Sequence, residues 1–276
     1  MTLFMRVTVG VHALSAAALL LWPDAWAWPV AALVLNHVGL MLGGLWPRAT
    51  WLGPNITRLP PAAVARGEVA LTLDDGPDPA VTPQVLDLLQ AHGARATFFC
   101  IAWRAAEHPA LVREIVARGH SVQNHSFRHR HNFSLLGPRG FAAELNRAQQ
   151  TLSALTGETP RFFRAPAGLR NPFLQPVLAR LGLTLTSWTR RGFDTREADP
   201  QRVLSRLMSG LAAGDILLLH DGHGAHAADG RPVVLQVLPA LLQQIRQAGL
   251  HCVTLPDAMP EPVAVTPDFT PLTSRQ

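Results

Sequence analysis

The stretch ALTLDDGPDPAVTPQVLDLL, residues 70–89, joins an apolar run to an amphipathic one through two adjacent carboxylates. Residues 69–73 combine β-branched and apolar side chains, as buried strands do, and a Gly-Pro pair then breaks the chain. Asp74 and Asp75 therefore end a predicted strand, where their like charges repel each other and burial increases the cost. A divalent cation bound to one of the two carboxylates would offset that repulsion.

The same alternation repeats along the chain. Seven short apolar runs are candidate strands, at 69–73, 96–101, 119–122, 161–164, 184–188, 215–220 and 251–255. Six amphipathic stretches follow them, at 80–92, 108–118, 138–156, 171–181, 200–212 and 231–248. This alternation predicts an α/β fold with a parallel sheet, and seven strands favour a barrel over an open sheet. In such barrels the chemistry gathers where the strands end.

The composition is that of a globular chain with an apolar excess. Hydrophobic residues are 48% and charged residues 16% of the 276 residues, which argues against disorder. All 24 basic residues are arginine and are scattered, so the net charge of +5 does not indicate a nucleic-acid partner. Cys100 and Cys252 lie in apolar segments, where we predict buried thiols and no disulfide.

The first 48 residues differ from the rest. Residues 7–22 and 26–46 carry no charged side chain, and the second segment is long enough for a bilayer, which takes about 20 residues. We therefore predict a transmembrane helical hairpin over 1–48, in a bacterial-type inner membrane. Arg6 and Arg48 flank the hairpin and only Asp24 lies in its turn, so the positive-inside rule places the remaining chain in the cytoplasm.

An alternative interpretation treats the first apolar segment as a signal peptide cleaved near 25–27. The second segment would then anchor a domain outside the cytoplasm. Residues 49–67 are predicted to form a linker, since they hold several prolines and little periodicity. The alternating region at 68–256 is then a single domain, followed by a proline-rich tail at 257–276.

Polar side chains follow several predicted strands. The segment NHSFRH at 124–129 follows the third strand, and LLLHD at 217–221 ends the sixth. His125 and His129 are four residues apart, so on a helical turn their imidazoles would share a face and meet one metal ion. Taken alone this pair also fits a solvated helix face, just as DDGP fits a turn that begins a helix. A carboxylate at a neighbouring strand end completes a set typical of catalytic zinc sites.

Five motifs, in this order, resemble those of the polysaccharide deacetylase family, carbohydrate esterases that share a domain with the nodulation chitooligosaccharide deacetylase. They are TLDDGP at 72–77, NHSFRH at 124–129, RAPAG at 164–168, FD at 193–194 and LLLHD at 217–221. The resemblance covers residues 68–256 and implies an irregular (β/α)7 barrel, in line with the seven expected strands. It also implies a hydrolase of carbon-nitrogen bonds other than peptide bonds, which removes N-acetyl or N-formyl groups from an amino sugar.

Matched motif by motif, the resemblance implies a role for each group. The implied metal ligands are Asp75, His125 and His129. Asp74 is the implied catalytic base, oriented by Arg164, and His220 is the implied general acid, held by Asp194. The expected ion is Zn²⁺, with Co²⁺ as the alternative. The ion would polarise the carbonyl, Asp74 would take a proton from water, and His220 would protonate the leaving amine.

The resemblance also implies a substrate pocket. Leu218 would contact the acyl methyl group, and Pro166 and Asn124 would lie beside it. Asn124 fits equally well a residue that supports the histidine pair and a loop cap. Nearby histidines outside the motif pattern are interpreted as solvated loop residues, namely His131, His223 and His226.

The chain departs from the family pattern near this pocket. Ala167 stands where the family carries an aromatic residue, and Thr195 stands where it carries tryptophan. Arg190 and Arg191 lie close by, and guanidinium groups suit a phosphate or another anion better than a long neutral glycan. Together with the membrane hairpin, this suggests a lipid-linked saccharide as substrate.

Two other functions use the same features. An O-deacetylase would need the same residues on the same scaffold. A membrane-tethered carbohydrate-binding protein with an inactive site would have no need of a base and an acid, so the full motif set disfavours it. The sequence leaves the oligomeric state open.

Overall fold

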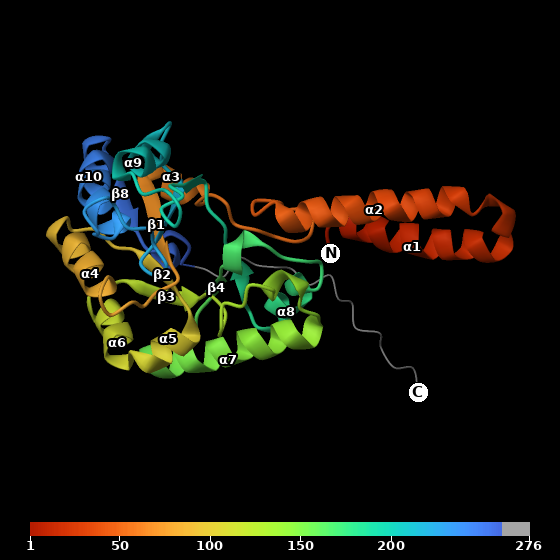
Figure 1. The fold of residues 1–276 in the computed structure, drawn as a ribbon, viewed down its shortest axis with the longest axis horizontal. Helices are drawn as coiled ribbons and strands as arrows, with labels where there is room; N and C mark the ends of the chain where they lie inside the picture. The colour runs from red at the N-terminus through yellow and green to blue at the C-terminus, as the bar shows by residue number, and fades with distance from the viewer. Residues whose placement is uncertain (261–276) are drawn as a thin grey trace.

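Two long helices project from an α/β domain in this chain (Figure 1). The computed structural model describes residues 1–260. Of the predicted tail at 257–276, residues 257–258 belong to the last helix and residues 261–276 lie outside the described residues.

The strands form one sheet in which every pairing between strands is parallel. They are β1 (Glu68–Asp74), β2 (Thr97–Cys100), β3 (Ser121–Asn124), β4 (Phe162–Phe163), β5 (Thr184–Leu185), β6 (Arg190–Arg191), β7 (Ile216–His220) and β8 (His251–Val253). Their order is β5-β4-β3-β2-β1-β7-β6, and β8 pairs with the first half of β1. Each predicted apolar run overlaps one of these strands, so the predicted parallel α/β sheet is confirmed.

One stretch of chain joins the two edges of the sheet. β5 pairs with β4, β6 pairs with β7, and only residues 186–189 separate β5 from β6. The sheet therefore curls into the expected irregular barrel. The sequence did not distinguish β6 as a strand of its own, because two residues are too few to show a period-two pattern.

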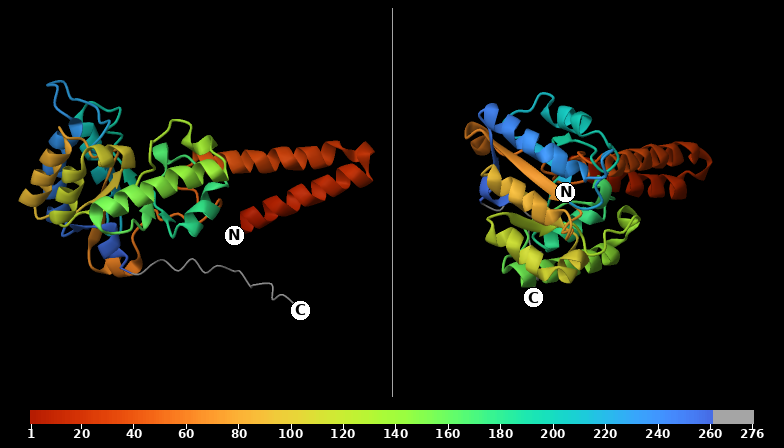
Figure 2. Two further views of the ribbon diagram at one scale, coloured as in Figure 1. Left: turned by 90° about the horizontal axis from the view of Figure 1, so that it is seen from below. Right: turned by 60° about the vertical axis from the view of Figure 1, so that its left-hand side comes forward.

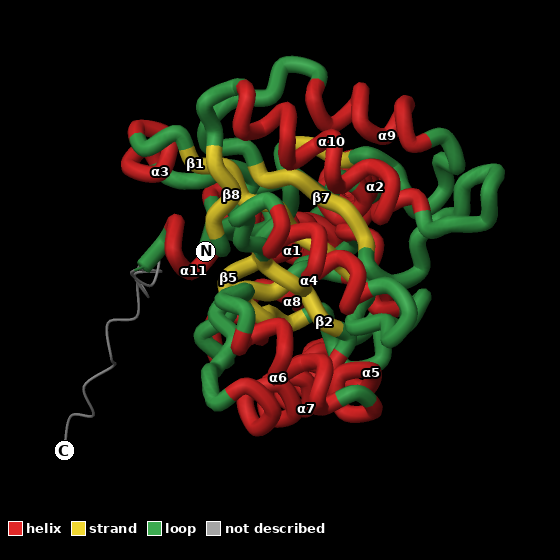
Figure 3. The backbone as a smooth tube through the Cα atoms, turned by 90° about the vertical axis from the view of Figure 1, so that its left-hand side faces the viewer, coloured by secondary structure: helices red, strands yellow, loops and turns green. Residues whose placement is uncertain are grey.

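Helices cover the outside of the barrel and extend beyond it. They are α1 (Leu3–Leu21), α2 (Ala27–Leu45), α3 (Pro61–Ala65), α4 (Thr82–Ala91), α5 (Ala102–Glu107), α6 (Pro109–Ala117), α7 (Pro138–Thr156), α8 (Leu174–Arg180), α9 (Pro200–Met208), α10 (Val233–Gln247) and α11 (Leu255–Ala258). Figure 3 shows α9 and α10 on one side of the strands and α6 and α7 on the other. The six predicted amphipathic stretches correspond to α4, α6, α7, α8, α9 and α10.

The alternation of β1 positions the first two motif carboxylates. Leu71 and Leu73 point outward into the core cluster that also contains apolar side chains of α4 and α10. Ala70 belongs to the inner cluster, and Thr72 and Asp74 contact a buried arginine inside the barrel. Because successive side chains of a strand point to opposite faces, Asp74 enters the barrel at its mouth.

The first two helices, α1 and α2, form an antiparallel hairpin that extends away from the barrel (Figure 2). Each has 19 residues and is apolar enough to cross a membrane. The Asn36 amide donates a hydrogen bond to the Thr8 hydroxyl at 3.0 Å and so links the two helices. At the hairpin base the Arg170 backbone N–H donates to the Gly44 carbonyl, and the Ser187 hydroxyl donates to the Pro47 carbonyl.

Residues 49–67, which we expected to form a linker, pack along the barrel. Leu52, Leu59 and Ala63 are buried, and Ile56 pairs with the chain that follows β5. The hairpin is therefore connected to the barrel by a folded segment.

Candidate metal centre and catalytic cavity

The carboxyl ends of β1, β3 and β7 open into a cavity of about 340 Å³. Five polar motif side chains line it together with apolar ones such as Leu218, namely Asp74, Asp75, His125, His129 and His220. These groups come from distant parts of the sequence and meet because the strands that carry them are neighbours or near neighbours in the parallel sheet.

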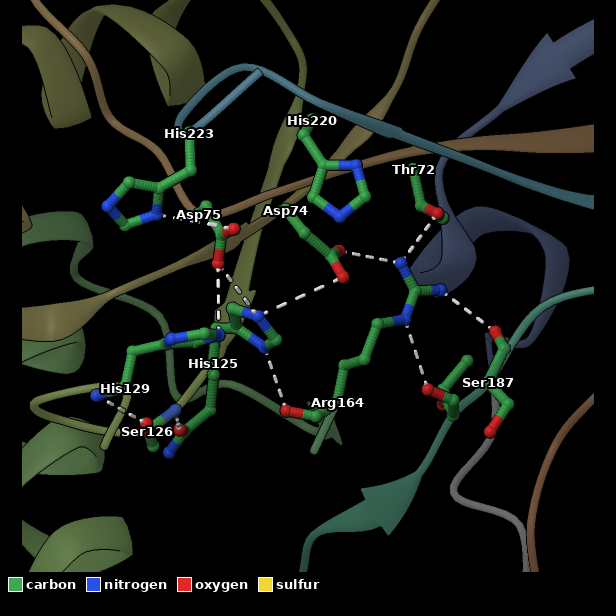
Figure 4. Close-up of polar contacts among 12 residues, drawn as sticks. Thr72, Asp74, Asp75, His125, Ser126, His129, Arg164, Ser187, His220 and His223 are labelled. Carbon is green, nitrogen blue, oxygen red and sulfur yellow. Dashed lines mark hydrogen bonds and ion pairs between the residues drawn. The ribbon is translucent and has the colours of Figure 1, made fainter. Parts of the chain in front are cut away.

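The predicted metal ligands converge on one point. Asp75 Oδ1 lies 3.2 Å from His125 Nε2 and 3.1 Å from His129 Nε2 (Figure 4). The three ligand atoms lie within 4.8 Å of one another, which confirms the predicted Asp-His-His triad. The expected helical turn is wrong, because Ser126 and His129 have φ values of 66° and 50°, and this loop conformation brings the rings together.

The donor atoms of this triad fit a divalent cation. His125 Nδ1 lies 2.8 Å from the Arg164 carbonyl oxygen, which only accepts, so Nδ1 carries the hydrogen and Nε2 is left as a ligand atom. Asp75 Oδ1 is buried and accepts no hydrogen bond from any described residue. An orphaned buried carboxylate oxygen facing two imidazole nitrogens is the chemistry of a two-His, one-carboxylate metal site.

Charge neighbours favour the ionised form of the ligand carboxylate. Burial opposes ionisation of Asp75, but the contacts of its carboxylate with the imidazoles of His125 and His223 outweigh burial and hold the pKa of Asp75 well below its usual range. Burial lowers the pKa of His129 to about 4, so this imidazole is neutral and able to bind a metal at neutral pH.

A buried guanidinium clamps Asp74. Arg164 Nη1 donates to Asp74 Oδ1 and to Thr72 Oγ1, each at 2.7 Å, and Nη2 donates to the Ser187 carbonyl at 2.8 Å (Figure 4). The second oxygen, Oδ2, lies 3.9 Å from His125 Nε2, beyond the ligand cluster. Asp74 is therefore held beside the triad without being part of it.

A second carboxylate holds His220. Asp194 is fully buried, and its Oδ1 lies 2.9 Å from His220 Nδ1 while its Oδ2 accepts the His220 backbone N–H at 2.8 Å. Burial lowers the pKa of His220, but the charge of Asp194 and the hydrogen bond to it outweigh burial and raise this pKa above its usual value. The other ring nitrogen, Nε2, remains available to a group in the cavity.

Two residues interpreted as solvated loop histidines line this cavity, namely His131 and His223. His223 Nδ1 lies 3.4 Å from Asp75 Oδ2, and Arg104 Nη2 lies 2.7 Å from His223 Nε2. Arg104 Nη1 also donates to the Asp75 carbonyl at 3.2 Å. No spacing in the sequence points to these contacts, because they depend on the path of the loop after β7.

Two of the expected pocket residues lie elsewhere. Leu218 lines the cavity, whereas Asn124 and Pro166 are buried and are not among the lining residues. Asn124 Oδ1 accepts the Ser126 N–H at 2.8 Å, and its amide donates to Gln149 at 2.9 Å. Asn124 therefore caps the loop that carries the histidine pair.

The two neighbouring arginines have different surroundings. Arg190 is bound to the Asp215 carboxylate and to the Ser209 and Gly210 carbonyls, so its guanidinium is occupied within the protein. Arg191 lines the cavity, as do Trp188 and a third arginine, Arg196. The expectation of two free guanidiniums at 190 and 191 is thus wrong for Arg190.

Comparisons with known proteins agree on one family. Residues 62–186 match the family model described as polysaccharide deacetylase. The chain is 33% identical over 195 residues to a chitooligosaccharide deacetylase of Bradyrhizobium, a match that covers 68% of this chain and 89% of that relative. It is 29% identical over 212 residues to a peptidoglycan-N-acetylglucosamine deacetylase of Bacillus cereus, with 76% and 92% covered.

Solved structures share the fold. A family 4 carbohydrate esterase from Streptomyces lividans, in complex with acetate, is 35% identical with a TM-score of 0.61, over 67% of this chain and 91% of that one. A pseudoenzyme of the same esterase family from Bacillus anthracis is 22% identical with a TM-score of 0.66, over 74% and 68%. Because only 22% of the residues are identical, the likeness to the pseudoenzyme shows a shared fold alone.

Proposed function

Because this chain belongs to the polysaccharide deacetylase family, hydrolases of carbon-nitrogen bonds other than peptide bonds, we propose that it removes an N-acetyl or N-formyl group from an amino sugar. The substrate would be a glycan or a lipid-linked saccharide. One observation carries the proposal: the Asp-His-His triad shares its cavity with a clamped carboxylate, Asp74, and a carboxylate-bound imidazole, His220.

Asp75, His125 and His129 would hold the cation, and their donor set suits Zn²⁺ or Co²⁺. A bound divalent cation supplies Lewis-acid polarisation of the acyl carbonyl and activation of water at neutral pH. Two contacts within the chain would orient the ligands. The Arg164 carbonyl would hold the His125 ring, and His223 would hold the Asp75 carboxylate.

Asp74 would act as the general base and His220 as the general acid. Arg164 binds Asp74 Oδ1 and holds the carboxylate in one orientation, so Oδ2 is free to accept a proton from the attacking water. His220 must be protonated to deliver a proton to the leaving amine nitrogen, and the Asp194 charge that raises its pKa favours this form. The amide C–N bond then breaks as the acyl group leaves with the oxygen of water, as acetate or formate.

The hairpin would anchor the enzyme in a membrane. Both helices expose most of their apolar side chains, including Leu14, Leu35 and Met41. Arginines at the base and an aspartate at the tip favour a cytoplasmic location for the barrel. A bilayer is the environment in which such exposed apolar helices are stable.

The test combines metal analysis with product release. Purified protein loaded with Zn²⁺ should bind one equivalent and release acetate or formate from acylated amino sugars. Asp74→Asn and His220→Ala should keep the metal and lose roughly 10²- to 10⁴-fold in kcat, because each loses one proton-transfer group. The surface variant Arg113→Gln serves as the control. Loss of metal in both variants would contradict the roles given to Asp74 and His220, and a metal-free, inert wild type would contradict the function.

A further inference from the structure

Two arginines at the cavity have guanidinium groups that no described carboxylate or carbonyl binds. Arg191 and Arg196 line the same cavity as the triad, and neither side chain forms a hydrogen bond or an ion pair with a described residue. Arg191 Nε is buried and unpaired. A buried donor left unsatisfied costs about 1–3 kcal/mol, so this arrangement is one that an anionic ligand would stabilise.

Aromatic rings hold Arg191 in place. Its guanidinium carbon lies 5.3 Å from the centre of the Trp188 ring and 5.0 Å from that of Phe193. A guanidinium close to aromatic rings is attracted to them through its charge, and its N–H donors lie in one plane. That geometry suits two oxygens of a phosphate better than the hydroxyl groups of a neutral sugar.

The same tryptophan connects the cavity to the hairpin. A Cβ placed at Gly168 would lie 2.7 Å from the Trp188 indole and 2.7 Å from Cβ of Pro47. Gly168 and Trp188 line the cavity, whereas Pro47 follows Trp46, the residue that caps α2. The cavity wall and the hairpin base are therefore in van der Waals contact at Gly168, which has no side chain to separate them.

Pro47 is also part of the wall of an apolar groove. This groove has a volume of about 810 Å³ at the hairpin base, and its walls include Phe4, Leu42, Leu45, Trp46, Pro47 and Trp51. Trp46 is exposed although its ring is apolar, as expected for a tryptophan at the level of lipid headgroups. Arg191, Trp188, Gly168 and Pro47 thus form one path from a cationic site to an apolar groove.

We infer that the amino sugar reaches this cavity attached to a membrane lipid through a phosphate, which binds Arg191 and Arg196 while the lipid chain lies in the groove beside Pro47. The inference rests on the proposed function and specifies its substrate class. Charge complementarity selects the phosphate, and the contact between groove and cavity selects a lipid over a soluble phosphorylated sugar.

Four substrates with the same acetylated sugar separate the contributions of charge and lipid. They are N-acetylglucosamine joined to a polyprenol by phosphate, N-acetylglucosamine 1-phosphate, dodecyl N-acetylglucosaminide and diacetylchitobiose. The full-length, Zn²⁺-loaded protein in detergent micelles should show kcat/KM for the lipid phosphate at least tenfold above that for each of the other three. Acetate release is measured for all four under the same conditions.

Variants then test the arginine. Arg191→Gln should lower the ratio of kcat/KM for the lipid phosphate to that for the dodecyl glycoside by about 10- to 100-fold, the range for a lost charge-assisted hydrogen bond. The ratio cancels any general loss of activity or folding. Arg191→Lys should restore part of it, since it keeps the charge and loses the planar fork. Arg246→Gln, an exposed arginine of α10, should leave the ratio unchanged.

Three results would overturn the inference and leave the deacetylase function standing. The first is a kcat/KM for N-acetylglucosamine 1-phosphate equal to that for the lipid phosphate. The second is an equal kcat/KM for the dodecyl glycoside or for diacetylchitobiose. The third is a ratio of kcat/KM values that Arg191→Gln leaves unchanged. Zn²⁺-loaded protein that releases acetate from none of the four substrates would overturn the function and the inference together.

Discussion

Asp74 and Asp75 are neighbours in sequence, yet they have different partners. Asp74 ends β1 and faces Arg164, whereas Asp75 has a φ of 72° and faces three imidazoles. Because β1 alternates its faces and the chain then turns sharply, two adjacent carboxylates of one cavity have different partners. The repulsion between them is offset by a guanidinium on one side and by a cation site on the other.

The pairing of His220 with Asp194 predicts a pH effect. Protonated His220 is needed for the proposed proton transfer, so activity falls as pH rises through its pKa. Asp194 raises that pKa, so Asp194→Asn should move the alkaline limb of the kcat profile to lower pH. Steady-state rates of the metal-loaded enzyme across pH measure this limb. Asp229→Asn, an exposed loop carboxylate, is the control, and an unmoved limb in Asp194→Asn would refute the pairing.

The contacts of His223 predict an effect on metal affinity. Arg104 can only donate, so His223 Nε2 accepts from it and Nδ1–H is directed at Asp75 Oδ2. His223→Ala and Arg104→Met should each weaken Zn²⁺ binding by roughly 10- to 100-fold, because the ligand carboxylate loses its orienting partner. Competition with a chromophoric chelator gives the Kd without any reference to turnover.

His226→Ala supplies the matched control, since His226 lies in the same loop but lines a different surface depression. If the Zn²⁺ Kd of His223→Ala equals that of His226→Ala, the orienting role is refuted.

At the scale of elements, the end of β7 is tied to the start of α4. Asp221 follows β7 and is buried, and the Thr82 hydroxyl at the start of α4 donates to its Oδ2 at 2.6 Å. A Cβ at Gly76 would lie 2.2 Å from the same oxygen, so only glycine allows the two motif loops to pack this closely. Burial raises the pKa of Asp221 to about 7.

This link predicts a pH-dependent loss of stability. Because the folded-state pKa of Asp221 is raised, the stability linked to its protonation is present below about pH 4 and is lost as pH rises through about 7. Thr82→Val removes the hydrogen bond to the ionised form, so it should lower the unfolding free energy by about 1–3 kcal/mol above pH 7 and by less at pH 5. Urea unfolding with a chelator present measures the difference.

Thr82→Ser keeps the hydroxyl and is the control for that experiment. A loss of stability in Thr82→Val that is the same at both pH values would show that the hydroxyl does not support the ionised carboxylate.

At the scale of the whole molecule, the barrel is attached firmly to its hairpin. The hairpin base accepts hydrogen bonds from Arg170 and Ser187, and Pro47 lies against the cavity wall. If the hairpin spans a membrane, the cavity lies close to the membrane surface. An enzyme built this way would meet substrates that are carried in the lipid more often than soluble ones.

The hairpin predicts a topology. An uncleaved hairpin puts the N-terminus and the barrel on the same side of the membrane and the tip at Asp24 on the other. Asp24→Cys should therefore react with a membrane-impermeant maleimide in intact cells, whereas Arg246→Cys, on the barrel surface, should react only after lysis. Wild-type protein, whose cysteines are buried or half-buried, is the blank. Labelling of Arg246→Cys in intact cells, or a mature N-terminus near residue 27, would support the cleaved alternative.

The α/β alternation and the apolar hairpin could be predicted from the order of residues, because period-two and helical patterns record burial. The triad of Asp75, His125 and His129 was predicted because its motifs resemble those of a known family, and the parallel sheet brings these motifs to one edge. Only the tertiary structure decided that Arg190 is occupied while Arg191 is free, that His223 reaches Asp75, and that Pro47 meets the cavity wall. These features depend on loop conformation and on contacts between distant segments. Loop conformation and distant contacts produce no periodic pattern in the sequence from which they could be predicted.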